Sequence, residues 1–198
     1  MYSKYDVYTT VQSIYCYRDS DVLKNKLNIH DKTELIQAEN QFVAVKQFML
    51  QKEPISGRFS KTHLMRIHRY LFEDIYPFAG HIRREYISKG DTTFYPPSQI
   101  DQELNRVFFE LHDKKLIYEK DLTIQINNLS YIMTELNIIH PFREGNGRAI
   151  REFVRCMALR YGVRLNWGKT ERDTLIEAAI RSIDDDKAFC VIIAQCIE

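Results

Sequence analysis

The sequence contains few residues that break helices and no excess of either charge. It has 7 Gly and 5 Pro among 198 residues, so helices can run for long stretches without interruption. Its 28 Lys+Arg nearly balance 27 Asp+Glu, whereas proteins that bind nucleic acid usually carry a basic excess. It lacks an apolar run of the roughly 18 residues that span a bilayer, and its first residues do not form a signal peptide. These absences predict a cytosolic protein that contacts neither a membrane nor, directly, nucleic acid.

Cysteine is also too sparse to provide a disulfide framework. No C-x-x-C pair occurs among the four cysteines, which are Cys16, Cys156, Cys190 and Cys196. We therefore expect free thiols in a reducing compartment, three of them on helices. With 44% hydrophobic residues, a chain of 198 residues can bury one core, and no linker or repeat divides it. The tyrosine-rich residues 1–22 are interpreted as an N-terminal arm packed on a single domain over residues 23–198.

Apolar residues recur every three or four positions along most of the chain, which is the period of an amphipathic helix. The first apolar stripe is expected to comprise Leu35, Ala38, Phe42, Val45 and Met49. Further helices are expected over residues 64–75, 98–111, 122–136, 150–161, 170–179 and 187–197. Ser60 is a candidate N-cap for the second helix, and Ser98-x-x-Asp101 resembles a capping box for the third. Thr170 is expected to open the short sixth helix, and Gly162 to end the fifth.

One segment departs from the helical period. Residues 82–95, IRREYISKGDTTFY, favour strands at both ends, with Lys89-Gly90-Asp91 between them and two prolines after them. This pattern predicts a β-hairpin. The fold class is therefore all-α, in a single domain with one small hairpin.

The chemistry is concentrated in residues 140–151, HPFREGNGRAIR, where one apolar helix ends and the next begins. Gly145-Asn146-Gly147 can take positive φ, which lets successive backbone N–H groups point into one concavity. The following helix directs its positive N-terminal end to the same place. We therefore expect a phosphate-binding nest at this junction.

The side chains around this junction suit a polyphosphate. Arg148 and Arg151 lie three residues apart, so both project from one side of the helix and can bind phosphate oxygens. Glu144 is a hard oxygen ligand that could hold Mg²⁺ against the phosphates. His140 is the group here that can accept a proton near pH 7. Alone, His140 would more often be a helix-end histidine and the other three solvated charges, but twelve residues rarely combine all four by chance.

This segment resembles the motif of Fic-domain proteins, H-x-F-x-[D/E]-G-N-G-R-x-x-R, at every defined position. The resemblance implies a helical Fic fold with a hairpin flap over the active site. It implies transfer of AMP from ATP to a Tyr, Ser or Thr hydroxyl of a target protein, with release of pyrophosphate. By the same resemblance His140 is the general base, Glu144 the Mg²⁺ ligand and Arg151 the γ-phosphate contact. The α- and β-phosphate cradle would be Gly145, Asn146, Gly147 and Arg148.

The predicted hairpin resembles the flap of the same family. Its pattern I-S-K-G-x-x-x-F is matched by Ile87, Lys89, Gly90 and Phe94. A hairpin with a free edge can pair with an extended target segment and hold its hydroxyl in register. Ile87 and Phe94 would then clamp the target. In the alternative, both side chains pack inward and the hairpin is an ordinary surface element.

Other functions remain open at this point. Kinases of the family carry a motif resembling G-N-K-R, and Gly147 in place of that lysine favours adenylyl transfer. Relatives that transfer UMP or phosphocholine are compatible with the motif. A silent binding module would not need both His140 and Arg151. A metal hydrolase is disfavoured because His63 and His68 are five residues apart and further ligands at helical spacing are lacking.

Many family members inhibit themselves with a helix bearing [S/T]-x-x-x-E-[G/N], whose glutamate pairs with the second motif arginine. The nearest match is Glu39-Asn40, but Leu35 stands where the hydroxyl residue belongs. We therefore predict no inhibitory glutamate in this chain, and expect Glu39 to face solvent or a local basic partner. The chain resembles members restrained by a separate small antitoxin, or a fragment of a longer effector that is delivered to a host cell. Self-association into a homo-oligomer is left open.

Overall fold

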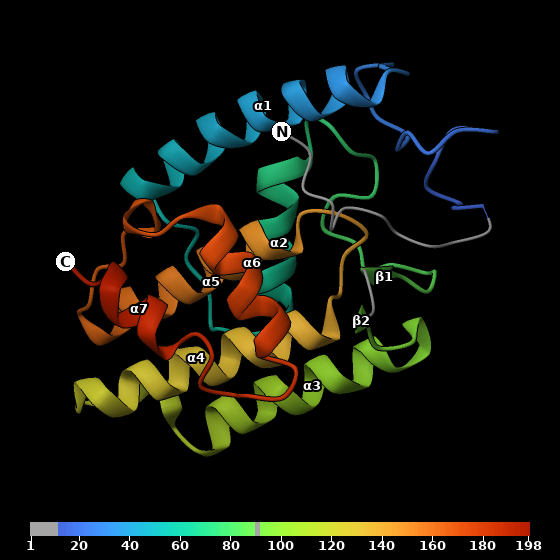
Figure 1. Cartoon of the computed structure of the whole chain (residues 1–198). Coiled ribbons are helices and arrows are strands. Elements are labelled where there is room, and N and C mark those ends of the chain that lie inside the picture. Colours follow the sequence, from blue (N-terminus) through green and yellow to red (C-terminus); the bar gives the residue numbers. More distant parts are fainter. Residues whose placement is uncertain (1–11, 90–91) are drawn as a thin grey trace.

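The computed structural model describes residues 12–89 and 92–198, and helices dominate that part of the chain (Figure 1). The α-helices are α1 (Lys32–Lys52), α2 (Lys61–Phe72), α3 (Pro97–Asp113), α4 (Leu122–Ile139), α5 (Asn146–Tyr161), α6 (Arg172–Arg181) and α7 (Cys190–Cys196). Two short 3₁₀ helices are η1 (Leu116–Tyr118) and η2 (Trp167–Lys169), and two strands are β1 (Ser88–Lys89) and β2 (Thr92–Thr93). The predicted all-α fold with one small hairpin is confirmed.

Helix α5 is the centre of the fold. It packs against α2 on one side and α4 on the other, while α4 also contacts α3 and α7. Every residue from 152 to 158 is buried, including charged ones, because the helix is covered on all sides. Helix α1 crosses α2 along the edge of the bundle (Figure 1). The phosphate-binding segment predicted from the sequence therefore lies at the N-terminal end of the most enclosed helix.

Several helix ends follow the sequence signals. The Ser60 hydroxyl caps α2 by accepting a bond from the backbone N–H of His63 at 3.3 Å. Gly162, at φ +84°, ends α5 as expected. The capping box at Ser98 was wrong, because α3 begins one residue earlier at Pro97, whose fixed φ suits the first turn. Helix α6 has Glu171 as its N-cap in place of Thr170, and α7 begins at Cys190.

The predicted apolar stripe of α1 is confirmed at Leu35 and wrong from Phe42 onward. Phe42, Val45 and Met49 are exposed by 39%, 64% and 48%, so this side of the helix faces solvent. The face that packs inward carries Leu35, Glu39, Val43 and Leu50. The hydrophobic pattern failed because it assigns glutamate to the surface, whereas Glu39 is buried against a cationic partner from a distant part of the chain.

The hairpin has a short paired region, and the described part of the arm packs against the core. Strands β1 and β2 pair antiparallel, Ser88 with Thr93 and Lys89 with Thr92, so the predicted hairpin is confirmed with a short paired region. Gly90 lies outside the described residues. From the arm, Val22 is buried in the core and Tyr15 packs against it. The division into residues 1–22 and 23–198 stays a prediction.

The structure also bears on the cysteines and on membranes. All four cysteines are free, and three of them lie in α5 and α7 as expected. Among the described residues, no helix is both long and apolar enough to cross a bilayer.

Candidate active site

The loop between α4 and α5 is held closed by its own residues. The buried Asn146 side chain accepts a hydrogen bond from the backbone N–H of Phe142 at 2.8 Å and donates one to its carbonyl at 2.8 Å. The Phe142 ring is fully buried and stacks on His68 at 3.7 Å between ring centroids, so its predicted inward position is confirmed. Both ends of the Asn146 side-chain amide are used by these bonds within the loop. Its backbone N–H is therefore the group that it can offer to a phosphate.

The turn into α5 requires one residue with positive φ. Gly145 takes it at φ +79°, whereas Asn146 and Gly147 already belong to the helix, so the predicted run of positive φ is shorter than expected. The N–H groups of the first three helical residues have no intrahelical partner. They sit at the positive end of the helix dipole, which is the arrangement that binds anions. This backbone geometry suits the predicted phosphate nest, which stays a prediction.

The two motif arginines lie in different surroundings beside this nest. The Arg148 guanidinium pairs with Glu39 at 2.5 Å, approaches Glu144 at 3.6 Å, and lies over the Phe72 ring at 4.7 Å. Burial, and the positive charges of Arg148 and Arg172, lower the pKa of Arg151 to about 10. These neighbouring positive charges favour an anion beside Arg151, whereas Arg148 already has a carboxylate partner.

Two carboxylates face each other across Arg148. Burial raises the pKa of Glu144, and the negative charge of Glu39 raises it further. The Glu144 carboxylate also accepts the backbone N–H of Gly145 at 2.9 Å. Tyr76 donates its hydroxyl hydrogen bond to Glu39, and burial together with Glu39 raises the pKa of Tyr76. Glu39 is therefore part of the site. The expectation that it faces solvent or a local basic partner was wrong, because it is buried and pairs with Arg148 from a distant part of the chain.

His140 ends α4 in a left-handed conformation at φ 49°. Its Nδ1 lies 3.1 Å from the backbone carbonyl of Asn137, which can only accept, so Nδ1 carries the proton. Nε2 is then the basic nitrogen of the ring. The Phe94 ring stacks on the imidazole at 3.8 Å between centroids, with 19° between the planes.

The flap side chains pack inward. Ile87 is 1% exposed and Phe94 7% exposed, which is the second of the two arrangements considered from the sequence. Phe94 therefore contacts the candidate base and is not free to clamp a target by its side chain. The paired backbone of Ser88 and Lys89 remains the element that could align a target segment.

His68, named from the sequence as a possible metal ligand, lies on α2 and supports the motif loop. Its Nε2–H donates to the Glu144 carbonyl at 2.9 Å, and its Nδ1 accepts the Gly80 N–H at 2.8 Å. Both ring nitrogens are used, so the histidine is neutral, and burial lowers its pKa to about 3. In the sequence, His68 was marked by its place within the apolar helical pattern of residues 64–75.

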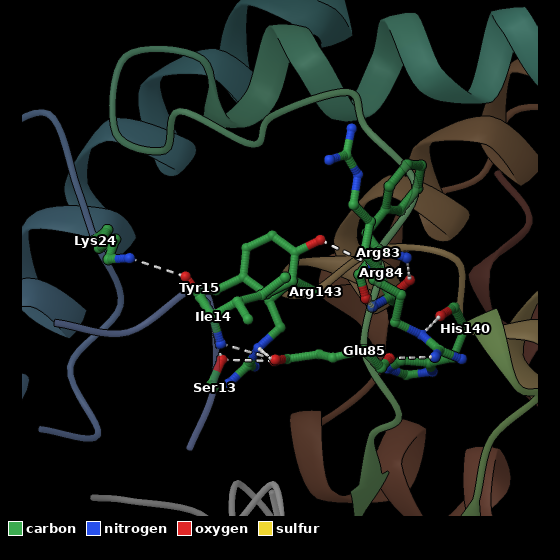
Figure 2. A network of polar contacts seen from close by, with 11 residues as sticks. Ser13, Ile14, Tyr15, Lys24, Arg83, Arg84, Glu85, His140 and Arg143 are labelled. Atoms are coloured by element: carbon green, nitrogen blue, oxygen red, sulfur yellow. Dashed lines mark hydrogen bonds and ion pairs between the residues drawn. The ribbon is translucent and has the colours of Figure 1, made fainter. Parts of the chain in front are cut away.

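A second polar network ties the arm to the motif loop (Figure 2). The carboxylate of Glu85 accepts from Arg143 Nε at 2.8 Å, from the Ser13 hydroxyl at 2.6 Å and from the Ile14 N–H at 3.1 Å. Arg143 occupies a variable position of the motif, so neither it nor Glu85 could be recognised from the pattern. The contact links the described end of the arm to the residues that follow His140.

The candidate base, the motif arginines and the two carboxylates border one large cavity of about 1290 Å³. Its walls come from α1, the motif loop, the flap, η2 and α6, and they include Glu39, His140, Glu144, Gly147, Arg148, Arg151, Trp167, Arg172 and Phe94. The volume accommodates a nucleoside triphosphate. Among the described residues, no group of three or more His, Cys, Asp or Glu side chains is placed to hold a metal ion.

This geometry coincides with a family assignment. Residues 58–158, which include the flap and the whole motif, match the model of the Fic/DOC family. The chain belongs to the Fic/DOC family. The match includes α2, the hairpin, α4 and most of α5, so it covers the elements that carry His140 and the helix N-terminus.

Curated relatives share this assignment. The chain is 34% identical over 164 residues to the protein adenylyltransferase VbhT of Bartonella schoenbuchensis, covering 83% of this chain and 34% of that protein. It is 33% identical over 183 residues to the probable protein adenylyltransferase y4lH of Sinorhizobium fredii, covering 91% of this chain and 93% of that protein. The chain thus spans about a third of the first relative and nearly all of the second.

Solved structures show the same fold. The BepC effector of Bartonella tribocorum, with AMPPNP bound, superposes with a TM-score of 0.84 at 23% identity, covering 93% of this chain and 96% of that chain. An N-terminal Fic domain from Bartonella quintana, with ADP bound, gives a TM-score of 0.85 at 24% identity, covering 93% and 94%. The expected Fic fold, with a hairpin flap beside the motif, is therefore confirmed.

Proposed function

We propose that this chain is a protein adenylyltransferase, which transfers AMP from ATP to a hydroxyl of a target protein. The observation that carries the proposal is the 3.1 Å contact of His140 Nδ1 with the Asn137 carbonyl. The ring proton is on Nδ1, bonded to the Asn137 carbonyl, so Nε2 is the nitrogen that can accept a proton at the edge of the cavity. The relatives named as protein adenylyltransferases support the same activity.

In the proposed reaction the target hydroxyl oxygen attacks the α-phosphorus of ATP. His140 Nε2 takes the hydroxyl proton as the new oxygen–phosphorus bond forms. The bond between the α-phosphorus and its bridging oxygen breaks, and pyrophosphate leaves with the electron pair. The N–H groups at the start of α5 would stabilise charge on the phosphate oxygens, with no reorganisation at the moment of reaction. Arg151 would contact the γ-phosphate, which relieves its repulsion from Arg148 and Arg172.

The acidic residues of the site fit a divalent cation. Glu144 and Glu39 lie close enough for mutual repulsion to raise the pKa of Glu144, and a hard cation beside Glu144 would relieve it. Glu144 would hold Mg²⁺ together with phosphate oxygens. When bound, the ion would neutralise charge on the triphosphate and on the departing pyrophosphate. The protein itself contributes the placement of Glu144, through the bond from His68 to its carbonyl.

The flap would align the target through its backbone. Ser88 and Lys89 form an edge of a two-stranded ribbon, and an extended segment could add to that edge. Phe94, stacked on His140, would set the distance from that segment to the base. Because a backbone edge does not read side chains, the identity of the target would depend on surfaces outside this pairing.

The cellular location and the remaining partners are also proposals. A cytoplasmic site of synthesis is supported by the four free cysteines. Delivery to a host cell is suggested by the Bartonella relatives of known structure, which are described as VirB-translocated effectors. A separate antitoxin, self-association and the absence of direct nucleic-acid contact stay predictions from the sequence.

The experiment supplies the chain with Mg²⁺ and ATP labelled at the α- or the γ-phosphate, in bacterial and eukaryotic lysates. Label should pass to a protein band, or to the chain itself, from the α position alone. His140→Ala should reduce this rate by about 10²–10⁴-fold with ATP binding kept. His112→Ala, at an exposed histidine of α3, is the matched control. Transfer from the γ position would support a kinase, and undiminished labelling by His140→Ala would remove the base assignment.

A further inference from the structure

Arg83 is an arginine buried in the protein interior, between α2 and the hairpin. It is 1% exposed, and it is the largest of the fully buried side chains. Buried arginines are normally paired with a carboxylate, because an uncompensated charge is costly to remove from water. Arg155 follows that rule by binding Glu152 through two nitrogens. Arg83 also donates hydrogen bonds to several backbone carbonyls.

The guanidinium of Arg83 binds backbone carbonyls from three segments of the chain. Its Nε donates to the His140 carbonyl at 2.8 Å, and its Nη2 to that of Ile139 at 3.3 Å (Figure 2). Its Nη1 donates to the Glu85 carbonyl at 2.8 Å, and Nη2 also to the Tyr95 carbonyl at 2.6 Å. One rigid planar group therefore joins the end of α4 to both legs of the hairpin.

The contact with α4 fixes the conformation of the candidate base. The last carbonyls of a helix lack intrahelical partners, and a cation there is favoured by the helix dipole. His140 is a non-glycine residue at φ 49°, a strained conformation that persists only where the surrounding structure enforces it. The bond from Arg83 to the carbonyl of this same residue opposes its relaxation, and so holds the direction of the imidazole.

The contacts with the hairpin fix the flap relative to that imidazole. Glu85 lies two residues before Ile87, and Tyr95 directly follows Phe94, so Arg83 bridges the base of the hairpin on both sides. The Phe94 ring stacks on His140. The guanidinium therefore fixes the positions of the flap edge and of the Phe94 ring relative to the His140 imidazole.

We propose that Arg83 is a positioning residue for adenylyl transfer, which aligns His140 and the target-binding flap as one unit. The proposal rests on the proposed function. The phosphate cradle is held separately, by the bonds of Asn146 to Phe142 and by Gly145. Loss of Arg83 should therefore disturb the transfer step while leaving ATP binding close to normal, which a general role in stability would not do.

Steady-state kinetics of Arg83→Lys and Arg155→Lys test this separation. Lysine keeps the charge at both sites, but its ammonium cannot bridge three segments, whereas at position 155 it can still pair with Glu152. Arg83→Lys should lower kcat by about 10²-fold, since misplacing a reacting group by about 1 Å has that effect. Its KM for ATP should stay within about threefold of the unaltered chain. Arg155→Lys should lose thermal stability with kcat retained.

Chemical rescue provides the second arm. Arg83→Ala leaves a guanidinium-shaped gap among four carbonyls, so millimolar guanidinium should restore part of its kcat, and methylammonium should not. Guanidinium should give no gain with His140→Ala. If Arg83 and Arg155 variants lose stability, ATP affinity and kcat in parallel, and guanidinium restores nothing, Arg83 is a structural residue and the proposal is wrong.

A third measurement separates this proposal from the proposed function. Should the unaltered chain transfer no AMP, hydrogen exchange at the hairpin amides and the His140 imidazole resonances still report the alignment. Arg83→Lys should speed exchange at the hairpin and shift the imidazole resonances, whereas Arg155→Lys should change neither. Unchanged exchange and resonances in Arg83→Lys would overturn the positioning role whatever reaction the protein performs.

Discussion

The glycine at the start of α5 offers a quantitative test of the site geometry. Gly145 has φ +79°, and a Cβ built there would lie 2.2 Å from Cζ and 2.4 Å from Cε2 of Phe72. Phe72 is fully buried, so its ring cannot move aside without disturbing the core. Gly145→Ala should therefore combine about 1–2 kcal/mol for the left-handed backbone with about 1–3 kcal/mol for overpacking.

Gly162, at the other end of the same helix, is the matched control. It has φ +84°, and a Cβ there would meet no heavy atom within 4 Å. Gly162→Ala should reduce the free energy of unfolding by about 1–2 kcal/mol, which is the backbone cost alone. The difference between the two variants then measures the clash with Phe72.

The assay is urea unfolding of both variants in one buffer, with calorimetric titration of ATP. Because the Phe72 ring also lies under the Arg148 guanidinium, Gly145→Ala should weaken ATP binding, and Gly162→Ala should not. Phe72→Leu in the Gly145→Ala background should recover part of the lost stability, as expected for residues in contact. Equal losses of stability in the two glycine variants, with equal ATP affinity, would refute the packing argument.

Three further predictions follow from the same site. Arg151→Ala should weaken ATP far more than ADP, since only ATP carries the γ-phosphate; equal losses in calorimetry would place Arg151 elsewhere. Glu39→Gln should lower the free energy of unfolding by about 1–3 kcal/mol, because Arg148 and Tyr76 lose a charged acceptor, with self-labelling changed less than tenfold. A gain of tenfold or more would make Glu39 an inhibitory glutamate after all. Below pH 6.5 the unfolded chain protonates His68 and the folded chain does not until about pH 3, so stability should fall by about 1.4 kcal/mol per pH unit from this group. Urea unfolding at pH 7.5 and 5.5 should show a smaller decline in His68→Gln, and an equal decline would refute the assignment.

The helices were predictable because their evidence is local. Ser60 and Gly162 mark helix ends through backbone bonds within a few residues, and the apolar period of α4 and α5 needs no distant partner. The face of α1 was not predictable. The burial of Glu39 depends on Arg148, more than a hundred residues away. The hydrophobic pattern of α1 alone does not indicate such an ion pair.

The sequence by itself determined the reactive segment of this protein. Residues 140–151 supply a helix N-terminus, a glycine turn, a histidine and two arginines within one stretch, and consecutive backbone N–H groups of this kind can build a phosphate site. Their order and spacing were enough to predict a nucleotide, and the family resemblance to predict the reaction.

Only the tertiary structure decided how that segment is supported. His68 holds the Glu144 carbonyl from α2, Glu39 holds Arg148 from α1, and Arg83 joins His140 to the hairpin. Each of these contacts joins residues at least 57 positions apart. They depend on which helix faces pack against each other. A buried polar group is stabilised by the partner that it meets at that contact, and a local sequence pattern does not record this partner.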